Sequence, residues 1–438
     1  MKYFFLSMLF LFVSITLNSQ TYKVVVEKSD SGMKLLVDGK DLMINGMNWD
    51  YVPIGKNYAY SLLKQSDELI KDALDAEMSL LKNMGVNTIR VYTGMQPKWI
   101  TYVYETYGIY TMLNHTFGRY GLTINGVWTP VTAYKDPKTK ILLLSEVTAI
   151  AKEYKDTPGL LLFLLGNENN YGLFWSGAET EDFPEGDEKK KFIGERLGRP
   201  MYKLMNDAAI KMKSINNNLP IAICNGDLLF VEIIAEECTD IDIYGTNMYR
   251  GKSFTDAFEI VKKELDMPIL FTEFGADAFN VISNKEDQEM QAFYMVENWK
   301  EIYQNAAGLG KSGNAIGGFT FQFSDGWWKY GQTKNLDVHD NNASWFNRGY
   351  NLDVEGSSDN NNMNEEWFGV CAKGPTNSKG LYNLYPRAAY FALQEVHQIN
   401  PFLKERNLTI ISEHFKKIRL KKHVLKAKEQ MATLLKNE

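Results

Sequence analysis

The chain has 438 residues, of which 45% are hydrophobic, and it carries a formal net charge of −6 at pH 7. This composition is typical of a globular protein with enough apolar material for a large core. The acidic balance argues against a nucleic-acid-binding protein, which usually presents a basic surface.

Residues 1–20 predict a secretory signal peptide. Lys2 precedes an apolar run from Tyr3 to Leu17, and small and polar residues follow it. The run is short and lies at the very start of the chain, which is typical of a cleaved signal rather than a membrane span. No cysteine lies near the expected cleavage point, so a lipid anchor is not expected. We therefore expect a secreted or periplasmic protein with no membrane span in its mature form.

Residues 21–45 predict an N-terminal β-hairpin. Two β-rich runs, Val24 to Val26 and Leu35 to Val37, are separated by the turn-forming sequence Asp-Ser-Gly. A short apolar run at 42–44 then leads into the sequence GMNWDY.

Residues 46–400 predict a barrel. Helical patterns alternate here with short apolar runs, and the clearest helix begins after Ser66 and ends at Gly85. We expect strands within 42–48, 86–92, 108–115, 160–169, 220–227, 241–249, 268–275 and 315–325. Eight strand–helix units favour an α/β fold, namely a (β/α)8 TIM barrel. A doubly wound open sheet is the alternative, but the sequence lacks the Gly-rich phosphate loop typical of that fold.

Two long loops and a basic tail accompany the barrel. Loops 169–191 and 326–385 follow strands four and eight, so both should lie at the C-terminal face, where barrel active sites are found. The second loop is rich in Asn and Asp. Calcium binding is one interpretation of that loop, but the EF-hand spacing is absent and a solvated loop is favoured. Residues 401–438 predict a basic helix, interpreted as packed on the barrel rather than as a partner-binding arm.

Histidine and cysteine patterns give no support for metal or covalent serine chemistry. The five histidines form no HExxH motif, and no Gly-x-Ser-x-Gly elbow is present. Three cysteines, Cys224, Cys238 and Cys371, are too few for a disulfide framework, although a Cys224–Cys238 bridge stays open beside the interpretation as buried thiols. We therefore expect no metal and no cofactor, and carboxylate chemistry is the remaining candidate.

Two glutamates end apolar strands that should face each other. Glu168 follows the run LLLFLLGN in strand four, and Glu273 lies in PILFTEFG in strand seven. A lone strand-end glutamate is as well explained by a structural ion pair. A pair across the mouth of a barrel is what glycoside cleavage requires: one carboxyl protonates the leaving oxygen, and the other attacks the anomeric carbon or activates water.

Three short motifs carry a family resemblance. GNEN at 166–169 and TEFGAD at 272–277 resemble clan A glycoside hydrolases, and the second is similar to the nucleophile segment of family 2. GNEN and RVY at 90–92 also resemble the β-1,3-glucanosyltransferases of family 72. The resemblance implies a retaining mechanism in which Glu168 is the acid/base and Glu273 the nucleophile.

The same resemblance implies supporting roles for three further residues. Arg90 and Tyr249 match positions that support the nucleophile, and Asn167 matches the residue that bonds the sugar 2-hydroxyl. From the residues alone, Arg90 could instead form a surface ion pair, and Tyr249 could be a packed core residue.

Other strand ends are candidates for sugar contacts. Strand eight departs from the clan, because Phe321 stands where Trp or Tyr is common, and a neighbouring tryptophan could supply the platform instead. Trp49, Asn114 and His115 are expected to line the negative subsites, Trp327 and Trp328 to offer that platform, and Tyr171 and Trp175 to reach the leaving-group side.

The sequence thus predicts a secreted retaining β-glycosidase that acts on a polysaccharide or oligosaccharide. No sandwich domain of the usual family 2 kind precedes the barrel, which favours endo action on a β-glucan such as β-1,3-glucan. A β-glucan transglycosylase and a non-catalytic glycan-binding barrel are the alternatives, and the oligomeric state is left open. Intact Glu168, Glu273 and Asn167 argue against the non-catalytic one.

Overall fold

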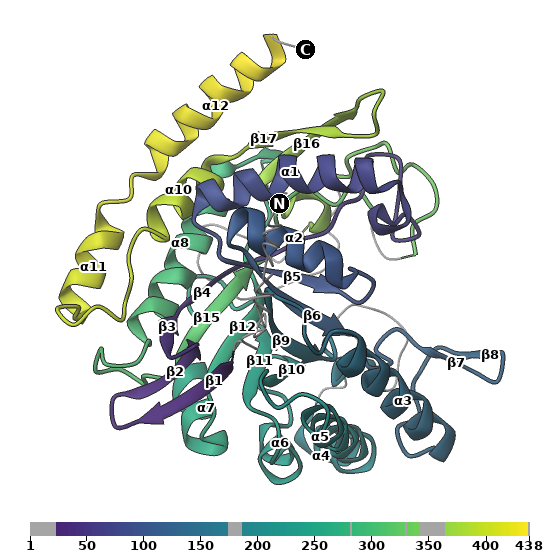
Figure 1. The fold of residues 1–438 in the computed structure, drawn as a ribbon. Coiled ribbons are helices and arrows are strands. Elements are labelled where there is room, and N and C mark those ends of the chain that lie inside the picture. The colour runs from purple at the N-terminus through teal and green to yellow at the C-terminus, as the bar shows by residue number, and fades with distance from the viewer. Residues whose placement is uncertain (1–22, 174–185, 281–282, 329–330, 342–363, 437–438) are drawn as a thin grey trace, which may run out of the picture.

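A computed structural model describes residues 23–173, 186–280, 283–328, 331–341 and 364–436. The predicted signal peptide, Trp175 and most of the Asn/Asp-rich loop therefore lie outside the described residues. Eight parallel strands close into a barrel inside a ring of helices (Figure 1), which confirms the predicted TIM barrel. In chain order the barrel strands are β4 (Ile44–Asn48), β5 (Thr88–Tyr92), β6 (Tyr110–His115), β9 (Leu160–Leu165), β10 (Ile221–Gly226), β11 (Ile243–Asn247), β12 (Ile269–Phe274) and β15 (Ala315–Thr320).

At least one helix follows every barrel strand. The first, α1, has the two end signals that its sequence predicts. The Ser66 side chain accepts from the Leu69 N–H, and Gly85 ends the helix with a φ of 90°. The barrel helices are α1 (Asp67–Met84), α2 (Pro97–Tyr107), α3 (Pro137–Glu153), α4 (Asp187–Ile193), α5 (Arg199–Lys213), α6 (Val231–Glu237), α7 (Ala257–Leu265), α8 (Gln288–Gln304) and α10 (Ala388–Val396). A π-helical turn, η3 (Gly194–Gly198), joins α4 to α5.

The N-terminal segment is a three-stranded sheet, so the predicted hairpin was one strand short. Strands β1 (Val24–Ser29) and β2 (Gly32–Val37) form the hairpin, and β3 (Lys40–Leu42) adds to β2. Charged Lys40 and Asp41 hid this third strand from the apolar pattern. Backbone bonds from Met33 N to the Gly313 oxygen and from Val24 N to the Asn218 oxygen hold the sheet against segments that precede β15 and β10. The sheet therefore covers the N-terminal end of the barrel.

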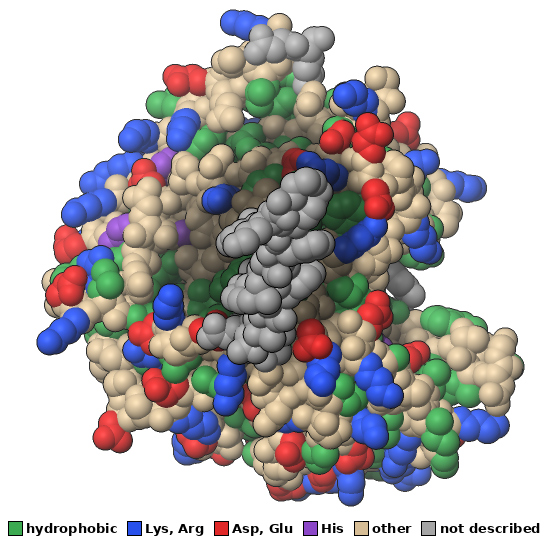
Figure 2. All heavy atoms as spheres, viewed as in Figure 1, with side chains coloured by type: hydrophobic (Ala, Val, Ile, Leu, Met, Phe, Trp, Pro, Cys, Tyr) green, Lys and Arg blue, Asp and Glu red, His purple; other side chains and the backbone are tan. Residues whose placement is uncertain are grey.

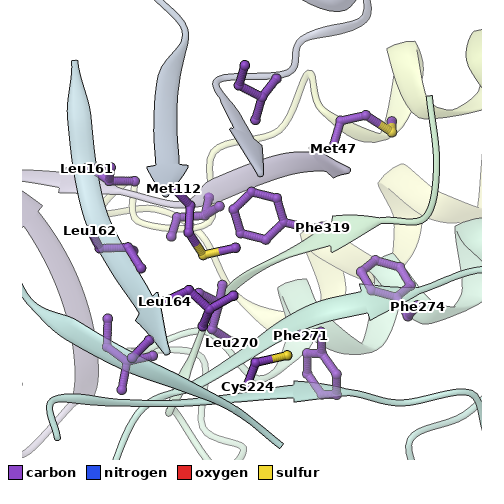
Figure 3. Close-up of a cluster of buried hydrophobic side chains, with 14 of the residues drawn as sticks. Met47, Met112, Leu161, Leu162, Leu164, Cys224, Leu270, Phe271, Phe274 and Phe319 are labelled. Atoms are coloured by element: carbon purple, nitrogen blue, oxygen red, sulfur yellow. The ribbon is translucent and has the colours of Figure 1, made fainter. Parts of the chain in front are cut away.

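The barrel interior is apolar in its middle and polar near the C-terminal ends of the strands. Figure 3 shows Met112, Leu164, Leu270 and Phe319 meeting inside the ring of strands. One layer nearer the C-terminal ends, the inward positions carry polar groups. Alternation along each strand puts this polar layer at the mouth, because residues two apart share a face. It comprises Asn48, Arg90, Asn114, Asn247 and Thr272, all of them buried.

The loops at the C-terminal face carry small elements of their own. Short antiparallel pairs are β7 (Leu122–Ile124) with β8 (Val127–Thr129), β13 (Phe279–Asn280) with β14 (Lys285–Glu286), and β16 (Cys371–Thr376) with β17 (Tyr382–Pro386). Single 3₁₀ turns are η1 (Leu62–Lys64), η2 (Tyr171–Leu173) and η4 (Glu365–Trp367). These excursions shape the rim around the polar layer.

The basic tail forms two helices, α11 (Leu408–Lys416) and α12 (Leu420–Lys436). Ile411, Phe415 and Ala427 are buried, and both helices contact α8 or α10. Lys and Arg side chains lie on the outer side of these helices (Figure 2). All three cysteines are free and buried, so the alternative Cys224–Cys238 bridge is not formed. Within the described part of the chain, no helix has the length and apolar character to cross a membrane.

A buried ion pair fastens the segment after β15. Arg387 donates to both Asp325 oxygens, at 2.6 and 2.7 Å, and neither side chain is exposed by more than 2%.

Arg387→Met should lower the free energy of unfolding by about 3–5 kcal/mol, because it leaves Asp325 buried and uncompensated. Denaturant unfolding measures this. Asp325→Leu combined with Arg387→Met should recover much of the loss. Lys98→Met, in an ion pair that is more than half exposed, should cost at most about 1 kcal/mol; an equal loss there would contradict the account.

Candidate active site

Glu273 faces the mouth because β12 bulges beside it. The register shifts between Thr246 and Asn247 on β11, so that Phe271 pairs with Thr246 and Glu273 with Asn247. As a result Thr272 and Glu273 both face inward: the Thr272 hydroxyl donates to Asn247 at 2.7 Å, and Glu273 accepts from Arg90. Bulges of this kind often aim a side chain next to an active site.

Arg90 is the centre of the polar layer. Its Nη1 lies 2.7 Å from Glu273 Oε1 and 3.1 Å from the Thr272 carbonyl oxygen. Its Nη2 donates to Asn167 Oδ1 at 2.7 Å and to Asn114 Oδ1 at 2.6 Å. The side chain is 1% exposed, so the interpretation as a surface ion pair does not fit. One guanidinium thus orients groups on strands β6 and β12 and on the loop after β9.

Tyr249 completes the support of Glu273. Its hydroxyl donates to Glu273 Oε2 at 3.2 Å, so each carboxylate oxygen has a donor on a different strand. Its ring stands edge-on to Phe368 at 5.9 Å and to Phe321 at 6.5 Å, which holds the hydroxyl in place. The structure brings Arg90, Tyr249 and Glu273 together.

Glu168 follows β9 in an unusual backbone conformation. Its φ is 56°, a left-handed conformation that costs a non-glycine residue of order 1–2 kcal/mol. The N–H of Glu168 donates to the Cys224 carbonyl oxygen at 3.0 Å, and its own carbonyl accepts from Tyr171 N. The strand end is therefore held by β10, and the side chain is only partly buried.

Two asparagines after Glu168 build the loop. Asn169 Oδ1 accepts from Asn167 N at 2.7 Å, and its Nδ2 donates to Phe117 and Tyr134 on the excursion that follows β6. Asn170 exchanges two hydrogen bonds with the Gly226 backbone, at 2.7 and 2.8 Å. Both side chains therefore form hydrogen bonds that fix the shape of the loop. Tyr171 packs its ring against Gly226, at the end of β10.

Asn247 lies between the two carboxyl groups. Its Nδ2 donates to Asn167 Oδ1 at 3.1 Å, and its amide group lowers the pKa of both Glu168 and Glu273. Asn167 in turn donates to the Tyr120 hydroxyl at 2.8 Å. Neither Asn247 nor Tyr120 was predicted as a site residue. The signal for Asn247 was its inward parity at the end of strand six, two residues before Tyr249.

The two carboxyl groups differ in electrostatic environment. Burial raises the pKa of Glu168 to about 7, and repulsion from Glu273 adds to that rise, while Arg119 opposes it. Burial also raises the pKa of Glu273, but the Arg90 guanidinium and the Tyr249 hydroxyl stabilise its charged form directly. Arg90 contacts Glu273 directly and favours its charged form. When the two carboxyl groups hold one proton between them, Glu168 is therefore the one that carries it.

Arg119 is a buried cation that sequence reasoning missed. Its side chain is 3% exposed, its guanidinium lies 5.5 Å from the Tyr120 ring centroid, and it packs against Gly172 on the loop after β9. It follows β6 within a polar, turn-rich stretch that carries no periodic signal. Only the fold places it near Glu168.

Three predicted sugar contacts are placed away from the mouth or beneath it. Trp49 donates to Glu77 on α1 at 2.6 Å, so its indole nitrogen points outside the barrel. Asn114 is completely buried, and both ends of its amide bond to protein atoms, including Arg90. His115 lies 3.2 Å from Glu146 on α3, on the outer side of β6.

The aromatic residues after β15 form two separate contacts. Trp327 stacks on His339 with ring centroids 4.5 Å apart, and its indole nitrogen is buried with no hydrogen-bond partner among the described residues. Trp328 meets Tyr58, from the loop after β4, at 6.0 Å. Phe321 is partly exposed beside Tyr249. Trp175 and residues 342–363 of the Asn/Asp-rich loop lie outside the described residues. Among the described residues, no three or more His, Cys, Asp or Glu side chains form a group that could hold a metal ion.

Comparisons with known proteins give weak similarities in sequence and a similarity in fold. No family model matches the chain. It is 24% identical over 259 residues to the 1,3-β-glucanosyltransferase gel2 of Aspergillus fumigatus, an alignment that covers 56% of this chain and 49% of gel2. It is 26% identical over 152 residues to a β-galactosidase of Lactococcus lactis, covering 34% of this chain and 13% of that protein.

Among solved structures, a family 2 β-galacturonidase from Eisenbergiella tayi superposes with a TM-score of 0.54 at 14% identity, over 87% of this chain and 55% of that one. At that identity the likeness is one of fold. The sequence and structure matches together confirm the predicted resemblance to family 72 and family 2 enzymes. The chain spans at most about half the length of the curated relatives that it matches.

Replacing Glu168 by Gln should change how stability depends on pH. The raised pKa means that native Glu168 keeps its proton up to about pH 7, whereas the unfolded chain releases it near pH 4.5. Ionising a buried carboxyl costs native-state stability, so wild type should lose stability relative to Glu168→Gln as pH rises from 5 to 8. Denaturant unfolding at both pH values measures the difference. Glu232→Gln, at an exposed position on α6, serves as control. A difference that does not change with pH would show that Glu168 is already ionised at pH 5.

Proposed function

We propose that this protein is a secreted retaining β-glycoside hydrolase that cleaves a polysaccharide or oligosaccharide in an endo fashion. The observation that carries the proposal is the unequal support of two carboxyl groups at one barrel mouth. Glu273 is bonded to a buried guanidinium and a tyrosine hydroxyl, whereas Glu168 has a pKa raised to about 7. Unequal carboxyl groups of this kind divide the roles of nucleophile and proton donor.

The reaction then runs in two displacements. Glu168 donates its proton to the glycosidic oxygen while a Glu273 oxygen attacks the anomeric carbon, so the aglycone leaves as an alcohol and a glycosyl ester remains on Glu273. In the second step Glu168 removes a proton from water, the resulting hydroxide displaces the ester, and Glu273 is released as a carboxylate. Both steps invert the anomeric centre, which gives net retention.

The electrostatics suit this cycle. Repulsion from the Glu273 charge is one cause of the raised pKa of Glu168. Forming the ester removes that charge, so the pKa of Glu168 falls and the group is ready to act as a base. Arg90 and Tyr249 hold Glu273 ionised before attack and accept its charge again as the ester breaks.

A β-glucan such as β-1,3-glucan is the favoured substrate, supported by the similarity to a 1,3-β-glucanosyltransferase. The same residues would serve a transglycosylase, in which a sugar hydroxyl replaces water in the second step. A non-catalytic glycan-binding barrel is less well supported, since it has no use for the bonded Arg90–Glu273 pair. Secretion rests on the signal-peptide pattern in residues 1–20. A product profile on β-glucans, β-mannans and β-galactans separates hydrolysis from transfer.

An activated 2-fluoro glycoside should label Glu273. The fluorine slows both displacements, and the good leaving group restores the rate of the first only, so the ester accumulates. Intact-mass and peptide mass spectrometry should find one adduct on the Glu273 peptide, and Glu273→Gln should give none. Glu232→Gln should label like wild type. Failure to label with β-glucosyl, β-mannosyl and β-galactosyl reagents would argue against a retaining mechanism.

Removing the acid should affect poor leaving groups far more than good ones. Glu168→Ala should lower kcat/KM on unactivated glycans by about 10²–10⁴-fold, the usual contribution of general acid catalysis, and much less on an aryl glycoside with an acidic phenol. Wild-type kcat/KM should fall above about pH 7, where Glu168 loses its proton, and the variant should lose that limb. Azide should restore turnover by attacking the ester. Equal losses on both substrates would rule out an acid/base role.

A further inference from the structure

The hairpin β7–β8 presents an exposed tryptophan on a loop at the C-terminal face of the barrel. It belongs to the excursion between β6 and α3, and it protrudes from the body of the molecule (Figure 1). Asn125 and Gly126 form its turn with φ values of 52° and 79°, as tight two-residue hairpins require. Trp128 is 58% exposed and Val127 66% exposed. Figure 2 shows hydrophobic side chains on the surface at this edge.

The indole of Trp128 lies against a glycine backbone. Trp128 pairs with Thr123, so its side chain shares a face with Thr123 and Gly121. A Cβ atom on Gly121 would lie 2.6 Å from Trp128 Cζ2 and 2.9 Å from Cη2, which no real contact allows. The ring therefore occupies the space that a side chain at position 121 would need. Being held this way, it needs little ordering before it binds a ligand.

A short path of contacts joins this ring to the carboxyl groups. Gly121 follows Tyr120, whose hydroxyl accepts from Asn167, the neighbour of Glu168. Asn169 fastens the other side of the same excursion through Tyr134 and Phe117. The hairpin is thus built onto the loop that carries Glu168, at the C-terminal face of the barrel.

We propose that Trp128 is a stacking platform for a pyranose unit of a β-linked glycan, remote from the bond that is cleaved. This rests on the proposed function, because it adds a contact to a glycan that is bound at the same site. The apolar face of a β-linked pyranose, lined by axial C–H groups, packs well on an indole whose edge is held and whose remaining surface is open.

The exposed area fits a sugar better than a second copy of the chain. A tryptophan offers about 150–250 Å² of contact surface, whereas each side of a stable protein interface buries about 800 Å². Val127 points to the opposite face of the hairpin from Trp128, since neighbouring strand residues alternate. The tip therefore presents one ring to a ligand on that face.

Affinity electrophoresis tests the platform without relying on catalysis. Full-length wild type, Trp128→Ala, Trp128→Phe and Val127→Ala are run in gels that contain soluble β-1,3-glucan, β-1,4-mannan or β-1,4-galactan. At least one glycan should retard wild type. Trp128→Ala should bind it roughly tenfold more weakly, the effect of losing about 1.4 kcal/mol, while Trp128→Phe keeps most of the affinity. Val127→Ala, the matched control, should migrate like wild type, and thermal unfolding checks that all four fold.

The outcomes separate the platform from the chemistry. Lower affinity in Trp128→Ala alone supports the platform, even if no adduct forms on Glu273. Equal retardation of Trp128→Ala and wild type overturns it, even if the enzyme is active, and so does a wild type that none of the three glycans retards. Sedimentation that shows self-association of wild type but not of Trp128→Ala overturns it in favour of a contact between copies.

Discussion

The guanidinium of Arg90 is the group on which the whole mouth depends. A cation that is 1% exposed is costly to bury unless it is neutralised and every donor is used. Arg90 meets that condition through Glu273, two asparagine oxygens and a backbone carbonyl. Because these partners come from different strands, the barrel must close in one register for the charge to be satisfied. The same contacts that make the buried charge tolerable fix the orientation of Glu273.

Cys224 shows how the layer stays balanced. Its sulfur lies 3.2 Å from both Asn247 Oδ1 and Thr272 Oγ1, near the Arg90 guanidinium. Burial raises the pKa of the thiol to about 11, so it stays neutral near pH 7 and does not compete with Glu273 for the cation. The small side chain fills space in the layer beneath the two carboxyl groups. Because it is uncharged, it adds no charge next to the two glutamates.

The sequence was informative where local rules act along one strand or helix. Apolar runs, the Ser66 cap and the Gly85 stop located the barrel elements, and strand ends located Glu168, Glu273, Arg90 and Asn167. Reasoning failed where a residue's role depends on other strands. Trp49 and His115 end strands but point outward, because parity rather than position decides which side a residue faces. Arg119 lies in a turn-rich segment and Trp128 on a hairpin of two three-residue strands, and the position of both relative to the mouth follows from tertiary contacts.

The sheet at the closed end of the barrel is attached through main-chain hydrogen bonds and through its buried inner side chains. Met33, Val24 and Gly308 each bond across to a backbone partner, so the attachment does not depend on which side chains the strands carry outward. At the open end, by contrast, particular functional groups must meet within hydrogen-bonding distance. Substitutions should therefore be tolerated on the outer face of residues 23–42 and selected against around Arg90.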